Sequence, residues 1–112
     1  MDIQITGRNV TVSEELKSHV EGRIEALLSG YPRVESCHAI LGHEKYRFTA
    51  ELVVQGRDKL REAAQETTDD MYAAVDAALE KMDKQLRKAR EKMIERHHER
   101  QRLTDVEGGT GT

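Results

Sequence analysis

The residues from Asp70 to Lys88 constrain the fold most, because they are typical of one helix that carries an apolar stripe and a separate basic stripe. At about 100° per residue, the apolar residues of this region fall on one narrow face: Val75, Leu79, Met82, Leu86 and Met93. A row of lysines falls on a second face, about a third of a turn away: Lys81, Lys84, Lys88 and Lys92. Such a helix can pack on a hydrophobic core and present a row of ammonium groups to a polyanion.

The charge is distributed unevenly along the chain. Its formal net charge is −3, but residues 81–102 contain nine Lys or Arg and four Asp or Glu, which gives +5. A basic strip governs phosphate contacts more than the total charge does. The competing interpretation is a solvated helix with ion pairs between residues four apart. Glu80 and Lys84 have that spacing, but the pairs Glu91–Glu95 and Glu95–Glu99 carry like charges, so pairing explains the strip only partly.

Length and composition predict one domain over residues 1–102 and a disordered tail over residues 103–112. No segment resembles a signal peptide or approaches the roughly 20 apolar residues of a membrane span, so we expect a soluble cytoplasmic protein with no membrane partner. The single cysteine, Cys37, has no partner for an internal disulfide. Since it lies in an apolar-leaning run, we expect a buried thiol rather than a nucleophile.

Periodicity and breakers predict the secondary structure. Ile3 and Ile5 alternate with polar residues in a first strand, and a helix capped by Ser13 or Thr11 follows. Gly30-Tyr31-Pro32 ends that helix. The remaining elements are strands over residues 34–41, 46–55 and 59–65, and a helix that is capped by Thr67 or Thr68 and ends near Gln101.

The order βαβββα predicts an α+β fold with a four-stranded sheet and two helices packed on one face. The last three strands are joined by short turns and should form an antiparallel meander, with the first strand most simply placed beside the second. This topology resembles that of double-stranded RNA-binding domains in outline, although a fold does not fix a function.

Two segments carry a more specific resemblance. Residues 3–16 contain Ile5-Thr6-Gly7 in a strand that leads into the first helix, and residues 70–76 read Asp-Met-Tyr-Ala-Ala-Val-Asp. The second segment is followed by Lys81, by Lys84-Gln85-Leu86 and by Lys88. Together they resemble the ribosome hibernation promoting factors, also called ribosome-associated inhibitors, over about residues 1–95.

The resemblance implies a partner and a site. Family members bind the decoding side of the small ribosomal subunit, over the ribosomal RNA where messenger and transfer RNA would lie, and silence ribosomes in starvation or stationary phase. Their surface combines basic residues of both helices. The matching RNA-binding positions here are Arg23, Lys81, Lys84, Lys88, Arg90 and Lys92, while Asp70 and Tyr72 match the start of the second helix.

This chain departs from the family pattern in its first helix and in its length. Close relatives carry a second lysine one turn after the position of Arg23, where this chain has Glu25 and Ala26. The first helix should therefore contribute less positive charge. Long members add a dimerisation domain after a linker, so this chain, ending at Thr112, resembles the short class. We expect a monomer when it is off the ribosome.

Other functions find less support in the residues. The five histidines are not paired with Cys, Asp or Glu at a known catalytic or metal-ligand spacing, and Gly108-Gly109-Thr110-Gly111 lacks the flanking strand and helix of a phosphate loop. We therefore expect no enzyme, cofactor, metal or small-molecule substrate. One alternative is a protein-interaction module that docks through the apolar stripe of the long helix. Another is a true double-stranded RNA-binding domain, but Asp69 and Asp70 stand where that class carries lysines.

Overall fold

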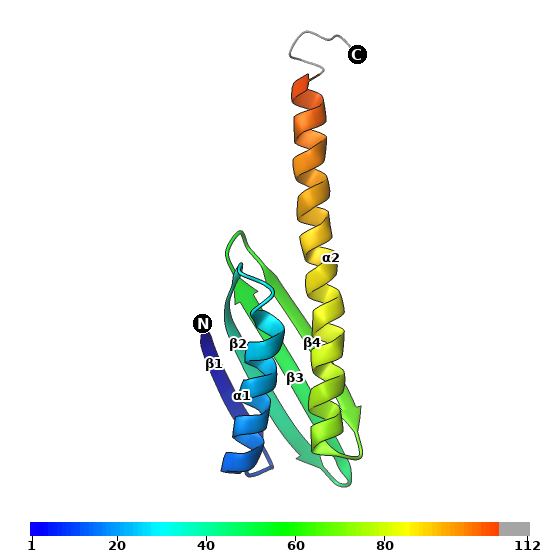
Figure 1. Cartoon of the computed structure of the whole chain (residues 1–112). Coiled ribbons are helices and arrows are strands. Elements are labelled where there is room, and N and C mark those ends of the chain that lie inside the picture. Colours follow the sequence, from blue (N-terminus) through cyan, green and yellow to red (C-terminus); the bar gives the residue numbers. More distant parts are fainter. Residues whose placement is uncertain (106–112) are drawn as a thin grey trace.

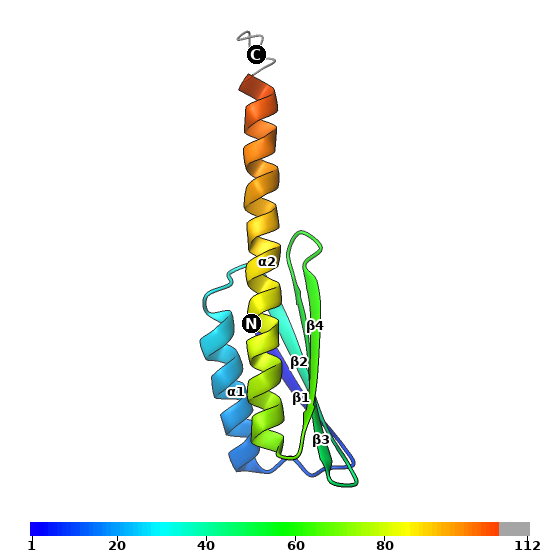
Figure 2. The same ribbon diagram turned by 90° about the vertical axis from the view of Figure 1, so that its right-hand side faces the viewer.

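A four-stranded sheet in the order β1-β2-β3-β4 forms one layer, and both helices cover the same face of it (Figure 1). The computed structural model describes the backbone of residues 1–105 and the side chains of residues 1–93. The elements are β1 (Asp2–Arg8), α1 (Glu14–Leu28), β2 (Val34–Glu44), β3 (Arg47–Gly56), β4 (Arg61–Thr68) and α2 (Met71–Asp105). The predicted α+β fold with the order βαβββα is confirmed, and Figure 2 shows both helices on one side of the sheet.

The strand pairing follows from the connections. β1 and β2 are joined through α1 and pair in parallel, so the first strand lies beside the second, as predicted. β2 with β3 and β3 with β4 pair antiparallel across tight turns. Asp58 and Lys59 in the β3–β4 turn both have positive φ, the geometry of the type I′ turns that suit the twist of a hairpin.

The strand boundaries differ from the predicted ones at three places. β2 runs from Val34 to Glu44, beyond the predicted residues 34–41. Its register against β3 also shifts between Val34 and Ser36, and this bulge explains why its apolar alternation is irregular. Tyr46 was expected in the third strand but lies in the β2–β3 turn, with 75% of its surface exposed. β4 spans Arg61–Thr68 rather than residues 59–65.

The caps of the two helices were predicted with unequal success. The Ser13 hydroxyl accepts a hydrogen bond of 3.1 Å from the Leu16 amide, which settles the first cap. α2 is capped by Asp70, whose carboxylate accepts 2.9 Å from the Ala73 amide, rather than by Thr67 or Thr68.

The sequence predicts a C-terminal end of α2 that lies too early in the chain. α2 ends at Asp105, beyond the expected Gln101, so residues 103–105 are its last residues. The rest of the tail predicted over residues 103–112 lies outside the described residues.

The hydrophobic core lies between the sheet and the two helices. The apolar stripe of α2 faces it as predicted, with Val75, Met82 and Leu86 each at most 2% exposed. Met93 is 36% exposed and lines a shallow pocket with Asp58 and Lys59 of the β3–β4 turn. Cys37 is buried as expected, and burial raises the pKa of its thiol to about 11.

The loop after α1 is fastened to the β3–β4 turn by reciprocal arginine contacts. The Arg57 amide donates 2.9 Å to the Arg33 carbonyl, and the Arg33 guanidinium donates 3.2 Å to the Arg57 carbonyl. The Arg57 guanidinium in turn donates 3.2 Å to the Pro32 carbonyl. Gly56 permits this approach, since a Cβ there would lie 2.1 Å from the Arg33 oxygen.

Candidate nucleic-acid interface

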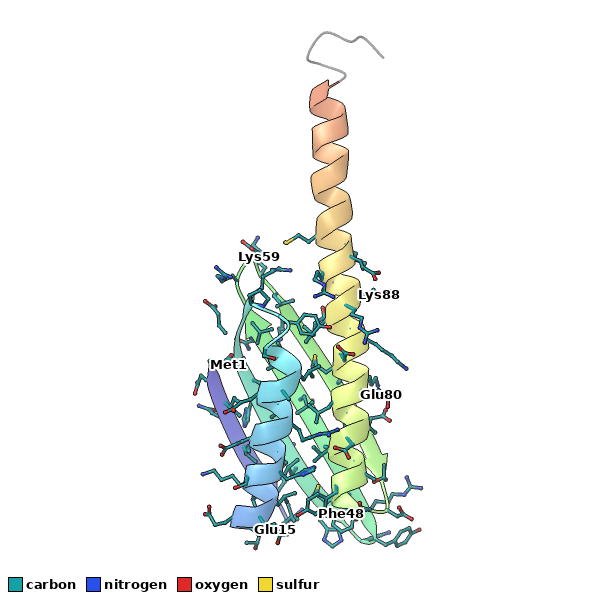
Figure 3. The ribbon with its side chains drawn as sticks, in the orientation of Figure 1. Met1, Glu15, Phe48, Lys59, Glu80 and Lys88 are labelled. Carbon is teal, nitrogen blue, oxygen red and sulfur yellow. The ribbon has the colours of Figure 1, made fainter. Side chains whose placement is uncertain are left out.

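Three exposed lysines on α2, namely Lys84, Lys88 and Lys92, form what we call the lysine row. Successive members are four residues apart, so each step rises about 6 Å along the helix. None of the ion pairs found among the side chains of residues 1–93 includes a member of the row, and the possible Glu80–Lys84 pair does not form. Figure 3 shows Lys88 on the side of α2 that faces away from α1.

Lys81 belongs to the same side of α2 but is attached to the sheet. Its ammonium lies 3.7 Å from Glu66 Oε1 and donates a 3.4 Å hydrogen bond to the Gln65 carbonyl, both on β4. Half of its side chain is exposed. Because ion pairs at such exposure contribute little, the contact with Glu66 orients Lys81 without removing it from solvent.

Arg23 lies between the two helices and faces a carboxylate. Its guanidinium is 3.3 Å from Asp76 Oδ1 on α2, and His19 Nε2 is 3.7 Å from the same oxygen. The His19 ring also meets the Tyr72 ring edge-on, with 4.8 Å between the centroids. Tyr72 and Asp76 therefore help to position α1 against α2, and Arg23 is part of this contact.

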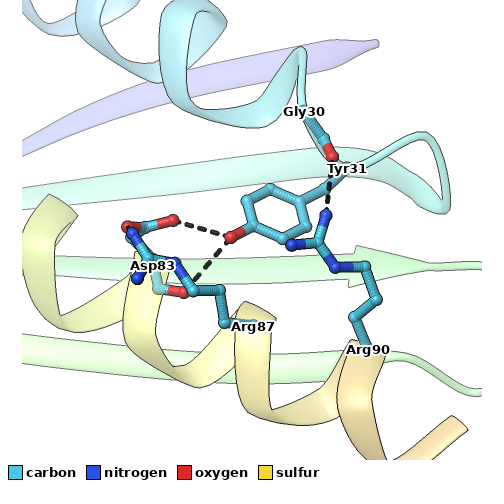
Figure 4. A network of polar contacts seen from close by, with 5 residues as sticks. All are labelled: Gly30, Tyr31, Asp83, Arg87 and Arg90. Atoms are coloured by element: carbon cyan, nitrogen blue, oxygen red, sulfur yellow. Dashed lines mark hydrogen bonds and ion pairs between the residues drawn. The ribbon is translucent and has the colours of Figure 1, made fainter. Parts of the chain in front are cut away.

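Arg90 lies at the other end of the helix pair, over the ring of Tyr31 at 5.1 Å from its centroid (Figure 4). The Tyr31 hydroxyl donates 2.7 Å to Asp83 Oδ1, and Arg87 donates 2.7 Å to Asp83 Oδ2. Burial, and then the hydrogen bond to Asp83, raise the pKa of Tyr31. Arg90 also donates 3.5 Å to the Gly30 carbonyl, so this cluster joins α2 to the loop after α1.

The six predicted RNA-binding residues thus fall into two groups. Lys81 and the lysine row lie on the outer side of α2, whereas Arg23 on α1 faces Asp76 of α2, and Arg90 on α2 faces the loop after α1. The groove between the helices has a volume of about 460 Å³, and its charged lining is Arg23, Asp76, Glu80 and Asp83. This lining carries more carboxylates than cations, so the lysine row, rather than the groove, suits a chain of phosphates.

Sequence reasoning missed the acidic partners of the arginines. Asp76 and Asp83 lie in the predicted helix, but nothing in their spacing shows that they face Arg23 and Tyr31 on distant segments. The described part of the chain offers neither a metal site nor a membrane-spanning helix. Within it, no group of three His, Cys, Asp or Glu is placed to hold a metal ion. No helix there is long and apolar enough to cross a membrane.

The sequence matches a known family and several curated proteins. A family model described as sigma 54 modulation protein / S30EA ribosomal protein matches residues 3–102. A ribosome hibernation promoting factor of Azotobacter vinelandii is 37% identical over 98 residues, which cover 86% of this chain and 89% of that relative. The protein of the same name from Escherichia coli K12 is 30% identical over 93 residues, covering 83% and 97%.

Solved structures agree with these matches. A ribosomal subunit interface protein from Coxiella burnetii superposes with a TM-score of 0.75 at 28% identity, covering 80% of this chain and 98% of that one. The N-terminal domain of Thermus thermophilus Protein Y superposes with a TM-score of 0.71 at 24% identity and shows the same fold.

Proposed function

This chain belongs to the family described as sigma 54 modulation protein / S30EA ribosomal protein, and we propose that it is a cytoplasmic ribosome hibernation factor. In this proposal it binds small-subunit ribosomal RNA at the decoding region and blocks the sites of messenger and transfer RNA under stress or in stationary phase. Relatives that are 37% and 30% identical over most of the chain bear the name ribosome hibernation promoting factor, which supports the assignment.

The lysine row is the observation that carries the proposal. Lys84, Lys88 and Lys92 are exposed, follow one helix at regular steps, and take no part in the ion pairs found among residues 1–93. Ammonium groups arranged in this way suit successive phosphates of an RNA backbone, and each contact releases counterions. Because phosphate contacts carry no sequence information, the shape of the ribosomal site would supply the specificity.

The mechanism requires occupancy and no chemistry. The lysine row, with Lys81 beside it, would hold the domain against RNA phosphates, and the body of the domain would then exclude the other RNAs. Arg23 and Arg90 act mainly in this scheme by fixing the angle between α1 and α2, since each already contacts a group on the opposite segment. We expect the free protein to be a monomer.

The alternative function considered from the sequence is docking of a protein partner through the apolar stripe of α2. The structure argues against it, because the stripe is buried. Leu79, Met82 and Leu86 are at most 6% exposed and pack in the core, so they are not available to a partner without unfolding. The remaining exposed surface of α2 over the described side chains is dominated by charge, which favours a polyanion over an apolar ligand.

Co-sedimentation of the full chain with purified small subunits, measured across a salt series, tests the proposal. The variant Lys84→Glu/Lys88→Glu should lose binding while its melting temperature stays unchanged, because both side chains are exposed. The logarithm of the binding constant of the wild type should fall linearly with that of the salt concentration, by a slope of about 1 per phosphate contact.

A matched control separates the lysine row from net charge. The variant Lys17→Glu/Arg61→Glu makes the same change in charge, but Lys17 lies on α1 and the Arg61 position faces the open side of the sheet. This control should still co-sediment at moderate salt. Equal losses in the two variants would show that only net charge matters, and retained binding by Lys84→Glu/Lys88→Glu would refute the proposed surface.

A further inference from the structure

Tyr46 is the most exposed aromatic side chain among the described residues, at 75% of its surface. It occupies the tip of the β2–β3 turn, at the end of the sheet where both helices begin (Figure 1). Of the other tyrosines, Tyr31 is 9% exposed, and Tyr72 is 39% exposed and packs edge-on against His19. The sequence predicts Tyr46 in the third strand, but Tyr46 lies in the turn and is exposed to solvent.

An aromatic pair packs at the base of the turn that carries Tyr46. At its base, His43 and Phe48 are cross-strand partners. Their rings stack with 4.3 Å between the centroids and 5° between the planes. Arg47 pairs with Glu44 in the strand register just below the tip. A packed support of this kind reduces the ordering cost when an aromatic side chain at the tip meets a ligand.

Cations stand on both sides of Tyr46 in the sequence. Lys45 and Arg47 are exposed, and neither takes part in the ion pairs found among residues 1–93; Glu44 is the one carboxylate in the turn. Lys45 has φ 58°, in the left-handed region where glycine is the favoured residue of such turns. A lysine therefore stands beside Tyr46 at a position where a glycine would be less strained.

We propose that Tyr46 is a stacking platform for an unpaired RNA base, with Lys45 and Arg47 contacting the phosphates on either side of that base. This inference rests on the proposed function and adds a second contact at the end of the domain opposite to Lys92. An aromatic face flanked by cations is the arrangement by which proteins bind single-stranded RNA, because every base has a face to stack and a charged backbone next to it.

An RNA base fits this tip better than an apolar protein surface does. Protein docking sites combine several buried apolar anchors, whereas the side chains next to Tyr46 in the turn are charged. A flat ring with a polar hydroxyl between two cations matches a nucleotide, which offers one planar group between two phosphates.

Substitutions at Tyr46 test the proposal in the full chain with purified small subunits. Tyr46→Ala should weaken binding by about 5- to 150-fold, with an unchanged salt slope because no charge is lost. Tyr46→Phe should bind like the wild type. Tyr46→Leu, which keeps an apolar side chain but has no aromatic face, should be impaired like Tyr46→Ala; wild-type affinity of Tyr46→Leu would show an apolar contact and overturn stacking.

Fluorescence gives a second readout, since the chain contains no tryptophan. The emission of Tyr46→Trp should be quenched when the variant binds small subunits or a short single-stranded RNA, whereas Tyr72→Trp, placed between the helices, should respond little. If Tyr46→Ala bound small subunits as tightly as the wild type does, and Tyr46→Trp showed no quenching, the stacking platform would be refuted. The proposed function would still stand. If the wild type did not bind small subunits, the proposed function would fail, and quenching by the short RNA would decide the platform on its own.

Discussion

The hydroxyl of Tyr31 donates a 2.7 Å hydrogen bond to Asp83 Oδ1, and this bond joins the loop after α1 to the middle of α2. The same carboxylate accepts a 2.7 Å hydrogen bond from Arg87, so it is shared by a neutral and a charged donor (Figure 4). Asp83 therefore helps to fix the position of α2 against the loop after α1. This contact lies at the end of the helix pair opposite to the Arg23–Asp76 contact.

Removing the Tyr31 hydroxyl should destabilise the protein modestly. Tyr31→Phe keeps the ring beneath Arg90 but removes the bond to Asp83, so the free energy of unfolding should fall by about 1–2 kcal/mol. Urea denaturation measures this change. Tyr72→Phe is the control, because the Tyr72 hydroxyl makes no hydrogen bond among the described side chains, and it should leave stability nearly unchanged. Equal effects of the two variants would contradict a specific role for the bond.

The buried thiol of Cys37 should make stability depend on alkaline pH. Its pKa is raised from 9.0 to about 11 in the folded protein by burial, so the unfolded chain releases the proton first. The stabilising contribution is complete below pH 9 and is lost as pH rises towards 11. At about 1.4 kcal/mol per pKa unit, the loss approaches roughly 3 kcal/mol.

The variant Cys37→Ala isolates that titration from the lysines and tyrosines that ionise in the same range. Its unfolding free energy, measured in urea at several pH values, should fall less steeply between pH 9 and 11 than that of the wild type. The absolute stability of the variant also changes because a cavity forms, so the slopes are compared rather than the values. Parallel slopes would show that Cys37 does not titrate with a raised pKa.

The sheet-facing stripe of α2 should end between Leu86 and Met93. Leu86 is 2% exposed and Met93 is 36% exposed, although both have the same helical phase. Leu86→Ala should cost about 2–5 kcal/mol through lost burial and a cavity, and Met93→Ala should change stability by about 0.5 kcal/mol or less. Thermal denaturation of both variants checks this, and a large loss in Met93→Ala would mean that the core continues along α2.

Local patterns predicted most of the fold because each reports a periodicity that burial enforces. The alternation over Ala50, Leu52 and Val54 identified the inner face of β3, and helical spacing identified Met82 and Leu86. The same method failed at Tyr46, since alternation continued into the turn and sequence alone did not show where pairing stops. It also failed at the cap of α2, where several good capping residues follow one another and the fold selects Asp70.

The candidate site likewise has one part that the sequence predicts and another that only the tertiary structure shows. The lysine row follows from spacing on a single helix, and its members are exposed as that spacing requires. The contacts of Arg23 with Asp76 and of Tyr31 with Asp83 join residues more than 50 positions apart, so they depend on how α1 packs against α2. Sequence can assign charge to a helix face, but only the tertiary packing decides which cations meet carboxylates.

Alanine substitutions at two glycines should change the free energy of unfolding in opposite directions. At Gly56 an added Cβ would lie 2.1 Å from the Arg33 carbonyl oxygen and 2.9 Å from its carbon, both backbone atoms that the α1–β2 loop holds in place. Gly56→Ala should therefore separate this loop from the β3–β4 turn and lower the free energy of unfolding by at least about 1–3 kcal/mol. Its Arg57 amide, which donates to the Arg33 carbonyl, should also exchange faster with solvent.

Gly22 lies within α1, and a Cβ added there would meet nothing within 4 Å. Gly22→Ala should raise the free energy of unfolding by about 0.5–1 kcal/mol, because alanine loses less backbone entropy in a helix. Denaturant unfolding of both glycine variants under one set of conditions gives the comparison. A stabilised Gly56→Ala would show that the loop can move aside, and a destabilised Gly22→Ala would show that the outer face of α1 is more crowded than the structure describes.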